Sequence, residues 1–136
     1  MASQASSPVA SSIWASMTRA RRTCHAVPGS SERFLAKAAG LAADEVFLDL
    51  EDAVAAGEKD RAREQVVAAL REQEYAAPTV VVRVNGTDTP HYYRDLVAVV
   101  EQAGERLDAI MLPKVRTPGD VEMTDKLLAQ IELACG

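Results

Sequence analysis

The sequence predicts an α/β fold in which β-strands and helices alternate along the chain. Two observations carry this prediction. Short apolar runs rich in β-branched residues recur about every 30 residues, and each run is followed by a segment whose apolar residues have helical spacing. Strands joined by such helical crossovers run parallel. The 136 residues hold four of these units in series, about the size of one ordinary domain.

The first unit shows the signals that define an element at each end. A strand is predicted over residues 23–29, "TCHAVPG", because Pro28 and Gly29 stop an extended run. A helix over 30–42 follows, and Ser31 is placed to cap its start. The first unit is therefore a strand followed by a helix.

The next three units repeat this order. Each has an apolar run that reads as a buried strand, followed by a segment with apolar residues on one face and charged residues on the other. The predicted elements are a strand over 45–54, a helix over 58–73, a strand over 79–86, a helix over 90–104, a strand over 108–115 and a helix over 117–136.

The ends of the predicted strands distinguish two architectures that use this alternation, the doubly wound sheet and the (β/α)8 or TIM barrel. In a barrel the carboxyl ends of all strands converge on one face, whereas an open sheet brings together only those at its switch point. No glycine-rich nucleotide-binding motif follows the first strand. Polar or turn-forming residues end every strand: Pro28 and Gly29, Glu51 and Asp52, Arg83 and Asn85, and Lys114. The sequence therefore favours the TIM-barrel fold, with four of its eight βα units present, a half barrel.

Composition argues against several classes of partner. The chain is 48% hydrophobic and 26% charged, with a net charge of -5, so it has no excess of positive charge for nucleic acid or for an anionic membrane. Cys24 and Cys135 lie far apart without a CxxC spacing, which favours free thiols in a reducing compartment and predicts a cytoplasmic protein.

The first twenty residues differ in composition from the rest. They are rich in Ser and Ala and lack the basic start and continuous apolar core of a secretory signal. No run approaches the roughly 18 apolar residues of a membrane span. We therefore expect a disordered leader over 1–20 and one structural unit over 21–136.

The stretch "EVFLDLEDAV" raises the question of function, because a buried strand should not end in Asp49, Glu51 and Asp52 without a use for carboxylates. Arg83 ends the next strand, and its planar guanidinium can grip a carboxylate through two parallel hydrogen bonds. Carboxylates beside a cation can bind a small charged ligand and transfer protons.

Four motifs give this chain a specific family resemblance. "RRTCHAVPGSSERFLAKAAG", "VFLDLEDAV", "VVVRVNGTDTP" and "DAIMLPKV" resemble the successive strand-end motifs of the HpcH/HpaI aldolase and citrate lyase β-subunit family, in the same order and at matching intervals. Within it they are most similar to the L-malyl-CoA/β-methylmalyl-CoA lyases. The resemblance covers roughly residues 19–136 and implies a TIM barrel.

The resemblance also implies a function and site residues. Family members cleave or form a carbon–carbon bond between a CoA thioester and a 2-oxo acid such as glyoxylate, with Mg²⁺ as Lewis acid, and usually assemble as trimers or hexamers. By resemblance, Arg83 binds the substrate carboxylate, and Glu51 and Asp52 are catalytic residues beside the metal. The metal-ligating Glu and Asp of the family come from later strands, beyond Gly136, so no metal ligand is expected in this chain. The 21–136 unit then corresponds to the N-terminal half of a CoA-ester lyase domain, inactive in isolation.

Other interpretations of these residues remain open. Asp49, Glu51 and Asp52 can instead pair with lysines or cap the next helix. The alternative function is a non-catalytic half barrel that binds a partner or self-associates through exposed strand edges.

Single residues elsewhere also have two interpretations. His25 on the first strand either points inward as a catalyst or is a structural residue, and His91 is expected to be solvated at a helix start. Asn85 and Gly86 can form a turn in left-handed conformations. Lys114 either faces the pocket or is a charge at its rim.

Overall fold

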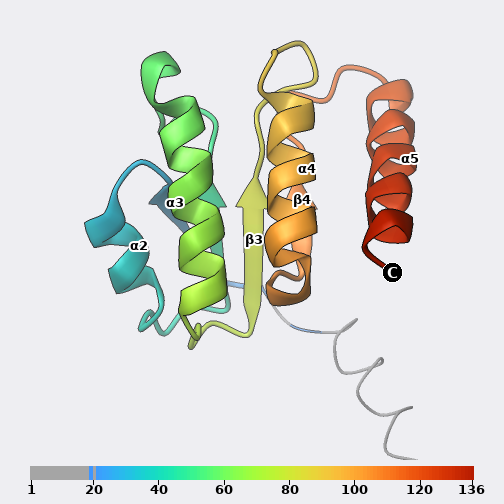
Figure 1. Cartoon of the computed structure of the whole chain (residues 1–136). Coiled ribbons are helices and arrows are strands. Elements are labelled where there is room, and N and C mark those ends of the chain that lie inside the picture. Colours follow the sequence, from blue (N-terminus) through green and yellow to red (C-terminus); the bar gives the residue numbers. More distant parts are fainter. Residues whose placement is uncertain (1–18, 20) are drawn as a thin grey trace, which may run out of the picture.

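A computed structural model describes residues 19 and 21–136, and over these residues the chain forms a parallel sheet covered by helices (Figure 1). The predicted leader over 1–20 lies, apart from Arg19, outside the described residues. The sheet has the order β1-β2-β3-β4, with every neighbouring pair parallel. Its strands are β1 (Cys24–Pro28), β2 (Glu45–Asp49), β3 (Thr79–Arg83) and β4 (Ala109–Met111). The expected α/β fold with four βα units is confirmed.

The helices follow the strands one by one. Figure 1 shows α2, α3 and α4 in front of the strands, on one face of the sheet, with α5 beside α4. A fold with helices on both faces of the sheet is therefore excluded for the described residues. The bounds are α2 (Glu32–Ala38), α3 (Lys59–Glu72), α4 (Tyr92–Ala103) and α5 (Pro118–Cys135), with short 3₁₀ turns η1 (Ala56–Glu58) and η2 (Gly104–Arg106).

Alternation along each strand divides its side chains between the two faces of the sheet. Val46 and Leu48 on β2 and Val82 on β3 are fully buried against the helices. Residues from all four helices complete this core: Leu35, Val66, Leu70, Leu96, Val99 and Ile131. The opposite face carries the intervening residues, including Asp49 and Arg83, which are direct partners in the β2·β3 register.

Capping chemistry fixes two helix starts. The Ser31 side chain accepts a hydrogen bond from the backbone N–H of Phe34, as the sequence predicts. At α5, Thr117 and Asp120 form a reciprocal capping box, and Pro118 occupies the first helical turn. Among the described residues no helix is both long enough and apolar enough to cross a bilayer.

The second strand is shorter than the sequence predicts. It ends at Asp49 rather than continuing to residue 54. The physical reason is local, because the Asp49 carboxylate accepts hydrogen bonds from the backbone N–H groups of Glu51 (2.8 Å) and Ala53 (3.0 Å). These bonds fold the chain into a turn directly after the strand.

Candidate functional site at the strand ends

Five charged residues meet at the carboxyl ends of β2, β3 and β4, and we call them the tip cluster: Asp49, Glu51, Asp52, Arg83 and Lys114. Asp49 ends β2, Arg83 ends β3, and Lys114 follows β4. The predicted proximity of Glu51, Asp52 and Arg83 is confirmed, because Arg83 Nη1 lies 3.8 Å from Glu51 Oε2 and Glu51 shares Lys114 with Asp52.

Asp49 and Arg83 form the centre of the tip cluster. Arg83 donates from Nε to Asp49 Oδ1 (2.8 Å) and from Nη2 to Asp49 Oδ2 (2.6 Å). The Asp49 side chain is 1% exposed and that of Arg83 is 23% exposed, so the carboxylate is shielded from water while the guanidinium is partly open to it. Burial alone raises the pKa of Asp49, but the hydrogen bonds from Arg83 and from two backbone N–H groups outweigh it and hold the pKa below its usual value.

Arg83 keeps donors beyond those that Asp49 occupies. A guanidinium has five N–H bonds, and the pair with Asp49 uses the Nε edge. The guanidinium also lies over Phe47, 5.2 Å from its ring centroid, which fixes the plane of the group. The hydrogen bonds with Asp49 raise the pKa of Arg83 further. Arg83 is therefore a permanent, oriented cation whose Nη1 makes no hydrogen bond with Asp49 and lies 3.8 Å from Glu51 Oε2.

Lys114 joins the two acidic residues that follow β2. Its Nζ pairs with the buried Glu51 carboxylate and lies 3.1 Å from Asp52 Oδ1. Hydrogen bonds to Glu51 and Asp52 raise the pKa of Lys114, and the Lys114 hydrogen bond lowers the pKa of Asp52. Lys114 has a φ of 53°, in the left-handed region. Of the two predicted positions, the structure puts Lys114 at the rim, bridging the acidic pair.

Lys59 is a member of the site that sequence reasoning missed. Its Nζ donates to the backbone carbonyls of Leu50 (2.8 Å) and Glu51 (2.5 Å), directly beneath the turn that presents the acidic residues. Burial lowers the pKa of Lys59. Lys59 is the first residue of α3, where a positive charge lies unfavourably close to the positive end of the helix dipole. This unusual placement is the feature of the sequence that could have identified Lys59 as part of the site.

A second polar network, also missed, holds the turn after β3. The buried Asp95 accepts hydrogen bonds from the backbone N–H of Asn85 (2.9 Å), from its side-chain amide (2.6 Å) and from Arg63 Nε (2.7 Å). The interpretation of Asn85 and Gly86 as left-handed turn residues is wrong, because neither has a positive φ. Asn85 instead anchors β3 to α4.

Neither histidine belongs to the tip cluster. His25 lines a hollow on the helix-covered side of β1, together with Phe34 and Leu41 of the α2 region, so the structure favours its structural interpretation. His91 precedes α4, and its ring Nδ1 is buried without a hydrogen-bond partner. The expectation that His91 is solvated is therefore wrong at this atom, because the partly buried ring keeps Nδ1 from water.

The tip cluster does not fit a metal ion by itself. The described residues contain no group of three or more His, Cys, Asp or Glu side chains that could hold one. Glu51 and Asp52 already share the Lys114 ammonium, and Arg83 lies beside Glu51. Two neighbouring cations disfavour the direct binding of Mg²⁺ to these carboxylates.

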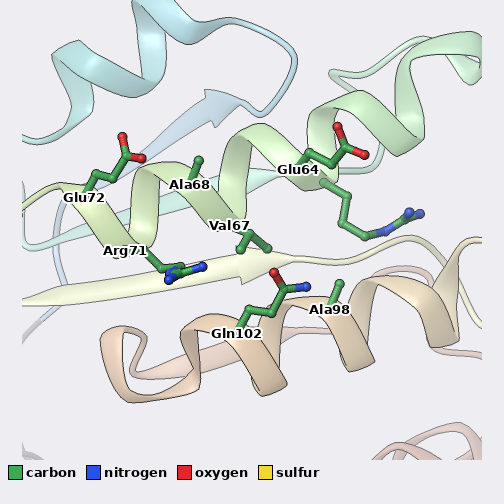
Figure 2. Close-up of a pocket in the computed structure, with 8 residues that line it drawn as sticks. Glu64, Val67, Ala68, Arg71, Glu72, Ala98 and Gln102 are labelled. Carbon is green, nitrogen blue, oxygen red and sulfur yellow. The ribbon is translucent and has the colours of Figure 1, made fainter.

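A separate hollow of about 450 Å³ lies on the helical layer between α3 and α4 (Figure 2). Val67 and Ala68 of α3 and Ala98 of α4 form apolar parts of its wall, and Arg71 and Gln102 extend along it. None of the residues predicted for the site lines it. The hollow is therefore distinct from the tip cluster.

Comparison with known proteins gives one matching family and a set of close relatives. The HpcH/HpaI aldolase/citrate lyase family matches residues 22–136. An L-malyl-CoA/β-methylmalyl-CoA lyase of Cereibacter sphaeroides is 46% identical over 109 residues, which are 80% of this chain and 34% of the relative. The citrate lyase subunit β of Leuconostoc mesenteroides is 42% identical over 118 residues, which are 87% of this chain and 38% of the relative. The chain thus spans little more than a third of the length of these relatives.

Solved structures agree on the fold. A malate synthase of Haloferax volcanii in complex with magnesium and glyoxylate has a TM-score of 0.75 and 25% identity, covering 85% of this chain and 38% of that one. The citrate lyase β subunit of Mycobacterium tuberculosis, complexed with oxaloacetate and magnesium, has a TM-score of 0.60 and 36% identity, covering 76% of this chain and 44% of that one. Both are TIM-barrel-like, so the four βα units correspond to part of such a barrel.

Proposed function

The chain belongs to the HpcH/HpaI aldolase/citrate lyase family, and we propose that it forms the N-terminal part of the active site of a carbon–carbon lyase. The substrates would be a CoA thioester and a 2-oxo acid such as glyoxylate. The single observation that supports this most strongly is the tip cluster, because it combines an oriented arginine with two further carboxylates at the strand ends.

Arg83 is the proposed substrate-binding residue. A 2-oxo acid carries a carboxylate beside its carbonyl, and the Nη1 side of Arg83 can donate hydrogen bonds to it while Asp49 holds the Nε side. Asp49 acts in this proposal as a positioning residue. It keeps the guanidinium in one orientation, which lowers the entropy lost when a ligand binds.

Glu51 and Asp52 are the proposed catalytic residues. Glu51 is buried and faces both Arg83 and Lys114, so a substrate bound to Arg83 would have the Glu51 carboxylate next to its polar end. A carboxylate at that position can accept a hydrogen bond or a proton from the hydroxyl group of a 3-hydroxyacyl thioester. Asp52 pairs with the same lysine but is exposed, so its carboxylate can contact solvent or substrate.

In this proposal Mg²⁺ is a cofactor whose protein ligands lie outside these 136 residues. The tip cluster does not fit the ion on its own, so the ligating carboxylates would come from segments that this chain does not contain. The isolated chain would then have negligible lyase activity. Binding of an oxo acid to Arg83 alone would be weak, since a partly exposed ion pair contributes about 0 to 1 kcal/mol.

A chimaera tests the proposed function. Residues 22–136 replace the matching segment of the Cereibacter sphaeroides lyase, and glyoxylate release from malyl-CoA is measured with Mg²⁺ present. The chimaera should be active. Arg83→Lys should lower kcat/KM by about 100-fold, since two-point binding of a carboxylate is lost.

Arg33→Lys is the matched control, because Arg33 is exposed on α2 and takes no part in the ion pairs of the tip cluster. It should leave kcat/KM unchanged. A folded chimaera with equal activity in the Arg83→Lys and Arg33→Lys variants would refute the role of Arg83. Activity of the isolated 136-residue chain at the level of the intact relative would refute the proposal that the metal ligands lie elsewhere.

A further inference from the structure

Lys114 has an unusual backbone conformation. Among the residues that the structure describes, it is the only one other than glycine with a positive φ, at 53°. A Cβ atom makes this left-handed conformation unfavourable, so it persists only where the surroundings hold it, and such residues gather at functional sites. Lys114 lies in the loop between β4 and α5, directly after Pro113. The contacts of its side chain indicate what the conformation serves.

The Lys114 side chain reaches across the carboxyl end of the sheet. Strand β3 lies between β4, which precedes Lys114, and β2, which precedes Glu51 and Asp52. Two strand spacings are about 10 Å. Lys114 Nζ nevertheless contacts the Glu51 carboxylate and lies 3.1 Å from Asp52 Oδ1. The side chain therefore connects loops that follow two strands which are not neighbours.

The Glu51 carboxylate depends on this contact. Its side chain is 7% exposed, and its Oε2 accepts a hydrogen bond from the backbone N–H of Asp52 at 3.1 Å. Arg83 Nη1 lies 3.8 Å from Oε2, which is too far for a hydrogen bond. Lys114 Nζ is the charged partner of the other oxygen, Oε1. Without the ammonium, Oε1 would lose that partner.

Asp52 depends on Lys114 even more. Its side chain is 66% exposed, and within the described residues its one ion pair is the one with Lys114. An exposed carboxylate turns among several rotamers, so this contact limits its orientation. Removing the ammonium would also leave the carboxylates of Glu51 and Asp52 beside each other without the cation between them, and like charges repel.

We propose that Lys114 is a positioning residue that holds the carboxylates of Glu51 and Asp52 in the orientation that the lyase reaction needs. This inference rests on the proposed function, in which these two residues are catalytic and Arg83 binds the oxo acid. Lys114 contacts the two carboxylates, so its loss should affect the chemical step more than substrate binding. Misplacing a reacting group by about 1 Å can lower a rate by about 100-fold.

Lys114→Met in the chimaera tests the proposal. The variant keeps a long side chain and removes the charge, so kcat for malyl-CoA cleavage should fall by about 10- to 100-fold. KM should change by less than about threefold, because Arg83 is intact. Lys114→Arg retains a cation and should recover most of the lost kcat. Arg116→Met is the matched control, because Arg116 lies in the same loop but pairs with Asp88. It should leave both constants unchanged.

A further variant separates the charge of Lys114 from its backbone conformation. Asparagine tolerates a left-handed φ but has no ammonium, so Lys114→Asn should be as slow as Lys114→Met. Circular dichroism verifies that each variant is folded. Parent-like kcat in Lys114→Asn would show that the backbone matters and the charge does not, and this would overturn the proposal. Lys114→Met with a normal kcat, or with a raised KM as its only defect, would overturn it as well.

The carboxyl carbon of Glu51 reports the contact independently of activity. In ¹³C NMR spectra of the 136-residue chain, Lys114→Met should shift the Glu51 carboxyl resonance, and Arg116→Met should leave it in place. An unmoved resonance in Lys114→Met would rule out the proposed contact. An inactive parent chimaera, or equal activity of its Arg83→Lys and Arg33→Lys variants, would instead refute the proposed function. The NMR comparison would then decide whether Lys114 orients Glu51.

Discussion

Arg83 and Asp49 are 34 residues apart in sequence, yet they are direct neighbours in the β2·β3 register and share two hydrogen bonds of 2.8 and 2.6 Å. The Asp49 carboxylate also accepts two backbone N–H bonds from the turn that follows β2. One buried carboxylate therefore orients the arginine of the candidate site and shapes the loop that carries Glu51 and Asp52.

Replacing Asp49 should destabilise the fold. Asp49→Asn leaves the partly buried Arg83 without its counter-charge and weakens the turn, so the free energy of unfolding should fall by about 3 kcal/mol. Urea denaturation followed by circular dichroism measures it. Asp52→Asn, at an exposed position of the same turn, is the control and should change stability by no more than about 0.5 kcal/mol. Equal stability of the two variants would contradict the structural role of Asp49.

Stability should fall in acid partly through Asp49. The pKa of Asp49 is lower in the folded chain than in the unfolded chain, where it is about 3.9. Its contribution is therefore fully present above about pH 3.9 and is lost as the pH falls through the lower folded value. The stability difference between the wild-type chain and Asp49→Asn should be constant near neutral pH and shrink below about pH 4. Denaturant titrations across this pH range measure the stability difference. A difference that widens in acid would contradict a lowered pKa of Asp49 in the folded chain.

Gly29 should resist substitution for a steric reason. A Cβ atom at this position would lie 2.7 Å from the carbonyl oxygen of Asp49 and 2.8 Å from Val66 Cγ2. Neither the β2 backbone nor the core can move freely, so Gly29→Ala should cost about 1 to 3 kcal/mol. Gly57→Ala is the control, because a Cβ there meets nothing within 4 Å. Thermal unfolding of both variants decides the matter, and a neutral Gly29→Ala would refute this close packing.

Lys59 should determine the rigidity of the acidic turn. Lys59→Met keeps most of the side-chain volume but removes the ammonium that caps the Leu50 and Glu51 carbonyls. We expect a loss of about 1 to 3 kcal/mol and faster amide hydrogen exchange at Ala53 and Val54. Lys126→Met on the exposed face of α5 provides the comparison. Unchanged exchange in the Lys59 variant would mean that Asp49 alone holds the turn.

The sequence by itself was sufficient for the order and type of the elements. Period-2 and period-3.6 patterns of apolar residues are local properties, so the four strands, the helices and their parallel connection could be predicted from short windows. The shared edge at which parallel strands end also made the proximity of Glu51, Asp52 and Arg83 predictable.

The tertiary structure alone decided which of these charges are paired with one another. That Arg83 binds Asp49, that Lys114 bridges Glu51 and Asp52, and that Lys59 supports the turn all depend on register and on distances between residues far apart in the chain. The same holds for Asp95, whose buried carboxylate replaced the expected left-handed turn at Asn85. Hydrogen bonds between side chains form over about 3 Å, and no local pattern encodes which groups come within that distance when the sheet closes its core.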